Sequence, residues 1–212
     1  MPVYPFRLPA ARILTYDLSR SPFSGTGELE WHHDAERYRA RLEGRIAGFS
    51  ILRWTSEGRI DGAGLAPERY TDRRRGSSEQ AARFDRVEGL VRYSAAAARP
   101  LPAGAQDRLS WMVQIAAIAQ ARPRPLAAGD RISLWVTGAR GDADVWHFRC
   151  TGVDSLPVAG RVVKTLHLIR EPREVGDTQV DVWLDPERDH LPVRAWLAAG
   201  RGDDRLELAL QA

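Results

Sequence analysis

The sequence predicts a mainly β protein in which one strongly curved antiparallel sheet, an open barrel or β-spiral, surrounds a single α-helix. Residues 106–121 form the one long helical pattern, and it is apolar around nearly its whole circumference. The rest of the chain reads as about a dozen short strands with alternating apolar and polar residues. A helix without a broad polar face has to be enclosed, and strands are all that the chain offers to enclose it.

Chain length and composition favour one domain. The 212 residues suffice for a large undivided β domain. Three prolines interrupt residues 1–11, which we expect to form an extended N-terminal arm, with a single domain over 12–212. Cys150 is the single cysteine, so no disulfide can form within the chain.

The strands before the helix are predicted from period-two alternation. Residues 37–44 place Tyr38 and Leu42 inward and Glu43 toward water. The adjacent apolar residues Ile51 and Leu52 predict a bulge or a phase shift. We expect strands or groups of short strands at 12–19, 27–33, 37–44, 45–58, 59–76 and 82–94, with a turn at 21–27.

The helix and the strands after it follow from similar signals. Ser110 and Gln114 give the helix only a narrow polar line, and the Arg-Pro-Arg-Pro run at 122–125 ends it. Gln106, Asp107 and Ser110 are suited to satisfying the free amides of the first turn. We expect further strands at 131–138, 144–153, 160–170, 179–185, 192–200 and 204–211, with tight turns at 140–144 and 201–204. Short connections favour antiparallel neighbours throughout.

The charge pattern excludes some classes of partner. The net charge is +3 and the sequence pI is about 9.4, almost wholly from arginine. Acidic residues alternate with the arginines, which gives a mixed surface and not the basic face that nucleic-acid binding needs. No run of about 18 apolar residues is present, so we expect no transmembrane segment.

Three segments together resemble a known family. They are GLAPERYTDRRRG (64–76), AQDRLSWMVQIA (105–116) and VDVWLDPERDHLPVR (180–194). Their order and spacing resemble the bacterial family called domain of unknown function 3108, over about residues 13–210. The resemblance implies a β-rich, partly open barrel or spiral with a central helix. It also implies an envelope protein, exported to the periplasm or anchored there, and it brings no catalytic residues.

The start of the sequence bears on that location. MPVYPFRLPAARIL contains no apolar signal core. We therefore expect a periplasmic or envelope location with the signal or anchor outside this sequence, and a cytoplasmic location is the alternative.

No motif predicts catalysis. The sequence has no metal-binding histidine or cysteine spacing, no nucleophile elbow and no phosphate loop. His32 and His33 are neighbours in a strand, so they point to opposite faces. We expect no catalytic residue, no metal and no cofactor.

Ligand or partner contacts are assigned to a small set of residues. The arginine-rich stretch around Tyr70 is either a solvated strand, paired with acids such as Asp85 or Glu88, or a clamp for an anionic group. Asp107 and Arg108, in the first turn of the expected helix, could form a polar cluster at the open end of the barrel. The candidate set is Arg69, Tyr70, Arg73, Gln106, Asp107, Arg108, Trp111 and Trp183.

Three functions remain open at this stage. The favoured one is a non-enzymatic envelope module that binds or scaffolds a protein, peptide or cell-wall component. The second is a carrier that shelters a lipid or lipoprotein acyl chain between helix and sheet, for which a groove of about 300 Å³ or more would be needed. The third is an unrecognised hydrolase that uses Asp107 with His147 or His167. The oligomeric state is left open.

Overall fold

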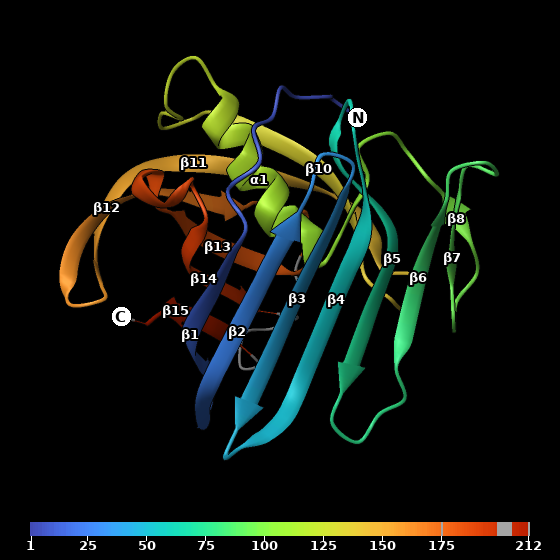
Figure 1. Cartoon of the computed structure of the whole chain (residues 1–212), viewed down its shortest axis with the longest axis horizontal. Helices are drawn as coiled ribbons and strands as arrows, with labels where there is room; N and C mark the ends of the chain where they lie inside the picture. Colours follow the sequence, from blue (N-terminus) through green and yellow to red (C-terminus); the bar gives the residue numbers. More distant parts are fainter. Residues whose placement is uncertain (175, 199–204, 212) are drawn as a thin grey trace.

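One sheet encloses one helix (Figure 1). The computed structural model describes residues 1–174, 176–198 and 205–211. Before the helix, the described strands are β1 (Arg12–Arg20), β2 (Phe23–His33), β3 (Arg37–Ile46), β4 (Phe49–Asp61), β5 (Gly64–Arg74), β6 (Gln80–Asp85), β7 (Leu90–Tyr93), β8 (Arg99–Pro100) and β9 (Gln106–Asp107). After α1 (Ser110–Ala121) come β10 (Arg131–Thr137), β11 (Ala143–Val158), β12 (Arg161–Arg170), β13 (Gln179–Leu184), the 3-10 turn η1 (Pro186–Arg188), β14 (Pro192–Ala198) and β15 (Arg205–Leu210).

The strand order is two meanders joined edge to edge. The first runs from β8 back to β1, and the second runs from β15 back to β9. They meet where β1 pairs with β15, with Tyr16 opposite Leu210. In the described part of the chain every strand pair is antiparallel except β9 with β10. The predicted class, one curved and largely antiparallel sheet around a helix, is confirmed.

The helix is enclosed as its composition requires. Every residue from Ser110 to Ala119 is buried. Trp111 stacks on Phe148 of β11 with ring centroids 5.1 Å apart, and it also meets Trp146 at 5.7 Å. The predicted start of the helix at residue 106 is wrong. Gln106 and Asp107 pair with β10 as a short strand, and the helix begins at Ser110.

Several strand boundaries also differ from the prediction. The segment 45–58 is not one strand, because the chain turns at Ala47 and Gly48, both with positive φ, before β4 begins. The turn at 21–27 is shorter than expected, since β2 already starts at Phe23. The described residues form fifteen strands, more than the dozen expected, partly because β8 and β9 are two residues long and carry no periodicity. The predicted turn at 201–204 lies outside the described residues.

The bulge in β4 is confirmed. Gly44 lies opposite Leu52 and Arg45 lies opposite Ser50, so Ile51 is the extra residue. The expectation that Glu43 faces water is wrong. Its side chain is 5% exposed because three arginines of β3 and β4 cover it.

The N-terminal arm covers the helix at one end of the sheet (Figure 1). The amide of Arg7 donates to Ala117 O at 3.0 Å, and the guanidinium of Arg7 donates to Gln120 O. The indole of Trp31 donates to Pro9 O at 2.9 Å. The arm contains neither helix nor strand, and these bonds hold it across the carboxyl-terminal half of α1.

Candidate functional site

The start of the helix is held by a reciprocal cap. Asp107 Oδ1 accepts from the amides of Leu109 and Ser110, both at 2.8 Å, and Ser110 Oγ accepts from the Asp107 amide at 2.8 Å. This is the bonding pattern of a capping box, with serine in the position that glutamate usually takes. Asp107 Oδ2 also accepts a 2.5 Å bond from Ser56, whose hydroxyl lies 2.9 Å from that of Tyr38.

Burial changes the titration of this carboxyl group. Desolvation raises the pKa of Asp107 to about 6, against the opposite effect of hydrogen bonds from Ser56, Ser110 and Leu109. Asp107 is completely buried, so its bonds are committed to fixing the helix inside the sheet.

Two glutamines tie the same region to β5. The amide of Gln106 donates to Leu65 O at 2.8 Å, and Gln114 accepts from Leu65 N at 2.8 Å while donating to Ala63 O. Gly64 makes this close approach possible, since a Cβ there would lie 2.5 Å from the Gln114 amide. The Gln106 bond joins β9 to β5 across the two halves of the sheet, which these two strands do not join by pairing, and the Gln114 bonds join the helix to the start of β5.

A hollow opens at the end of the sheet opposite the N-terminal arm. We call it the end hollow, and its volume is about 380 Å³. Its apolar lining comes from both halves of the sheet, namely Ile51, Leu52 and Trp54 of β4, Ala139 of the loop after β10, Leu197 and Ala198 of β14, and Leu206 of β15. Its polar lining is Arg20, Tyr70, Asp72, Arg74, Arg108, Arg140, Asp142 and Thr178, with Gly138.

Two of the predicted contact residues meet on this hollow. Arg108 pairs with Asp142 at 2.5 Å, and its guanidinium lies 4.7 Å above the ring of Trp146. Tyr70 is almost fully buried, and burial raises its pKa well above 10, with Asp72 raising it further. The hollow therefore presents a fixed cation and a neutral hydroxyl beside apolar walls.

The other predicted contact residues lie elsewhere. Gln106, Asp107 and Trp111 are fully buried around the helix. Arg69 and Arg73 are exposed on β5, on the face of the sheet opposite Tyr70. Trp183 belongs to a separate small apolar cluster. There it stacks on the imidazole of His167, with ring centroids 4.3 Å apart, and donates to Asp154.

The fold does not bring Asp107 together with His147 or His167, as the hydrolase hypothesis requires. Asp107 faces the interior, and its two oxygens are engaged as described above. His147 alternates with the buried Trp146 on β11, so it lies on the outer face, where it bonds Ser133 at 2.8 Å. His167 is held on β12 by its stacking on Trp183. No shared cleft joins Asp107 to either imidazole among the described residues.

Sequence reasoning missed most of the apolar lining of the end hollow. Alternation identifies Leu52 and Trp54 as inward-facing, but an inward position gives no sign of whether the space beyond it is filled. Leu197 and Leu206 lie about 150 residues away along the chain, and only the pairing of β1 with β15 brings them opposite β4.

No helix in the described ranges has the length and apolar character needed to cross a membrane. No group of three or more histidine, cysteine, aspartate or glutamate side chains is arranged to hold a metal ion in those same ranges.

Comparison with known proteins gives matches of two kinds. A family model described as "Protein of unknown function (DUF3108)" matches residues 15–209. The crystal structure of a beta-barrel-like protein of domain of unknown function DUF1849 from Brucella abortus is similar, with a TM-score of 0.57 and 13% identity over 97% of each chain. At this identity the likeness concerns the fold alone. No curated protein matches the chain. The family resemblance seen in the sequence is thereby confirmed.

Proposed function

The chain belongs to the DUF3108 family of proteins of unknown function. We propose that it is a non-enzymatic binding protein of the cell envelope. Its ligand is the acyl chain of a lipid or lipoprotein, held in the end hollow. The sequence alone favours a protein, peptide or cell-wall component, with the acyl chain as the alternative. The end hollow is the observation that moves the proposal to the acyl chain.

The size and lining of the end hollow support this ligand. Its volume of about 380 Å³ lies within the range of small-molecule sites, about 300–1,000 Å³. Leucine, isoleucine and tryptophan side chains from two halves of the sheet give it apolar walls, and transfer of an alkyl chain onto such walls is favourable by roughly 0.8 kcal/mol per buried methylene.

The place of the ligand differs from the one that the sequence suggests. The space between helix and sheet is filled there, because Trp111, Met112, Ile115 and Ile118 are at most 1% exposed. An acyl chain between these side chains and the strands would have to displace close-packed core. We therefore place the acyl chain in the end hollow, which is lined by β4 and β5 of one half of the sheet and by β14 and β15 of the other.

A cation on the wall supports a ligand with one polar end. Arg108 lines the end hollow, and its guanidinium is held over the ring of Trp146. A charged oxygen at the head of an acyl chain would bind this guanidinium by charge-assisted hydrogen bonds.

The composition of the lining supports binding without conversion. The described lining contains neither histidine nor cysteine, and its tyrosine stays protonated at physiological pH. A nucleophile and base within hydrogen-bond reach are what acyl transfer or hydrolysis needs.

Binding of a dansyl-labelled fatty acid, followed by its fluorescence, tests the proposal. Ile51→Trp adds a large ring to the wall of the end hollow, and Ile13→Trp adds the same ring at an exposed position of β1. We expect the first variant to weaken binding of the labelled fatty acid at least tenfold and the second to leave it within twofold. Equal affinities in both variants would place the ligand elsewhere, and no binding by the unaltered protein would refute the proposal.

The envelope location is tested separately. It is an expectation carried by the family resemblance. Fractionation of cells that express the natural gene with a carboxyl-terminal tag is expected to recover the protein with envelope markers. Recovery with cytoplasmic markers would contradict it.

A further inference from the structure

Two pairs of arginines that face each other on the outer surface of the sheet each share a carboxylate. Arg37 of β3 lies opposite Arg59 of β4, and both pair with Glu68, at 2.8 and 2.9 Å. An opposed pair on β10 and β11 shares Glu171 in the same way. A bridging anion removes the repulsion between like charges placed directly opposite one another.

Arg53 and Arg73 are directly opposite on β4 and β5, and they share no carboxylate in the described part of the chain. The same is true of Arg83, which lies opposite Arg69 and Arg92. Arg53 pairs with Glu43 at 2.9 Å, but this carboxylate also pairs with Arg41 and Arg45. Arg73 pairs with no carboxylate in the described part of the chain, and it is exposed. Arg53 and Arg73 therefore lack a bridging anion from the described residues, and unlike Arg83 they line a hollow.

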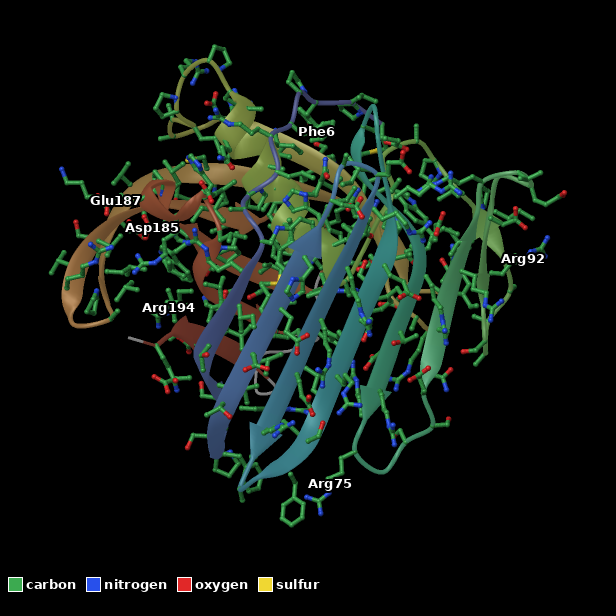
Figure 2. The ribbon with its side chains drawn as sticks, viewed as in Figure 1. Phe6, Arg75, Arg92, Asp185, Glu187 and Arg194 are labelled. Carbon is green, nitrogen blue, oxygen red and sulfur yellow. The ribbon has the colours of Figure 1, made fainter. Side chains whose placement is uncertain are left out.

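A second hollow lies beside this pair, and we call it the arginine hollow. Its volume is about 380 Å³, and its described lining is Ser50, Arg53, Arg73, Arg74, Arg75, Gly76 and Ser77. Four guanidinium groups and two hydroxyl groups line it, and no carboxylate does. Arg75 lies at the lower end of the molecule (Figure 2), with its guanidinium 4.4 Å above the exposed ring of Phe49.

The charges around the arginine hollow are poorly balanced. Arg74 pairs with Asp72 at 3.0 Å, and Arg53 has its share of Glu43. The guanidiniums of Arg73 and Arg75 add two charges that no carboxylate of the described chain neutralises. Glu43 is ionised under all ordinary conditions: its burial favours the protonated form, but hydrogen bonds, first that from Arg53, outweigh burial and lower its pKa to about 2.

We propose that the arginine hollow binds a phosphate group, with Arg53 and Arg73 as its principal donors. A guanidinium presents a planar fork of N–H donors that matches two phosphate oxygens at once. A doubly charged phosphate matches the two charges left over on Arg73 and Arg75 and supplies the missing bridge. The hydroxyl of Ser77 adds a donor at the same place, whereas that of Ser50 is hydrogen-bonded to Glu43.

The position of the arginine hollow indicates which class of ligand carries the phosphate. Arg74 lines both hollows, so they adjoin at the lower rim of the sheet. This part of the inference rests on the proposed function: the phosphate is the headgroup of the lipid whose acyl chain enters the end hollow. The ligand is then a phosphate-bearing amphiphile rather than a neutral one.

Titration calorimetry on the full chain tests both parts. The probes are inorganic phosphate, dodecyl phosphate below its critical micelle concentration, and dodecanol. Arg73→Gln removes one charge from the arginine hollow. Arg83→Gln removes one charge from an exposed β6 position that also faces an arginine, Arg69, but does not line the hollow. Arg73 is exposed and unpaired, so its variant is expected to unfold at the same temperature as the unaltered protein.

The expected result has three components. Dodecyl phosphate binds at least tenfold more tightly than either inorganic phosphate or dodecanol. Arg73→Gln weakens binding of dodecyl phosphate at least tenfold, and Arg83→Gln changes it less than twofold. Ile51→Trp weakens the binding of dodecyl phosphate but leaves the binding of inorganic phosphate unchanged.

Each alternative outcome removes a defined part of the inference. Equal losses in Arg73→Gln and Arg83→Gln would show a general charge effect and overturn the phosphate site. Inorganic phosphate binding as tightly as dodecyl phosphate, with dependence on Arg73, would retain the phosphate site and overturn the lipid headgroup. Sensitivity to Ile51→Trp without sensitivity to Arg73→Gln would overturn the phosphate site and leave the proposed function standing.

Discussion

Replacing Asp107 by asparagine isolates the energetic cost of a buried carboxylate at the start of the helix. Asparagine keeps an oxygen that accepts from the amides of Leu109 and Ser110. Its amide group can donate to Ser56 Oγ, where the aspartate oxygen now accepts. The substitution therefore retains the number of hydrogen bonds and removes the ionisable group.

The expected magnitude follows from the pKa of Asp107. Burial raises this pKa from 3.8 to about 6 in the folded chain. A carboxyl group with a raised pKa stabilises the fold fully below pH ~4, and this contribution is lost as the pH rises through ~6. A shift of about 2 units at about 1.4 kcal/mol per unit makes the whole effect about 3 kcal/mol, of which about 2 kcal/mol falls between pH 4.5 and pH 8.

Urea unfolding followed by tryptophan fluorescence at pH 4.5 and pH 8 measures the effect. We expect the free energy of unfolding of Asp107→Asn, relative to the unaltered protein, to rise by about 2 kcal/mol from the lower to the higher pH. Asp61→Asn, at the exposed end of β4, is the matched control and should show no such change. A difference between Asp107→Asn and the unaltered protein that is the same at both pH values would show that burial of this carboxyl group carries no such cost.

Three further substitutions test the packing, each by urea unfolding. Trp111→Ala removes a fully buried ring from the centre of the core and should cost about 3–5 kcal/mol; a loss below 1 kcal/mol would show that the helix is not enclosed. Arg170→Ala removes a buried guanidinium that pairs with the half-buried Asp144 and Asp177 and should cost about 1–3 kcal/mol at pH 7, with no loss contradicting the stabilising role of these pairs. Gly64→Ala forces a Cβ against Gln114 at φ +103° and should cost at least about 1–3 kcal/mol, whereas Gly62→Ala has open space and should be near neutral.

The fold was largely predictable because its main signals are local. The strands around Tyr16, Trp31 and Leu42 alternate with period two, and the structure buries each of these side chains. The extra residue at Ile51 also follows from two adjacent apolar residues. The two-residue strands β8 and β9 were not predictable, since so short a segment has no period to detect.

The candidate site was predictable only in part. Tyr70 and Arg108 lie among the predicted contact residues, and both line the end hollow. Their partners Leu197 and Leu206 were missed, because an inward-facing residue next to a hollow has the same sequence pattern as one in the packed core. Arg53 was missed because its role depends on which arginine faces it across the strand pair.

The enclosure of the helix by a curved sheet follows from the sequence alone, because an apolar segment of that length must be removed from water wherever it lies. The places where the sheet leaves space follow only from the folded arrangement of the strands. That depends on the pairing of β1 with β15 and on the strand register, which bring together side chains from opposite ends of the chain. Hollows are what close packing fails to fill, and that failure is a property of the assembled sheet and of no single segment.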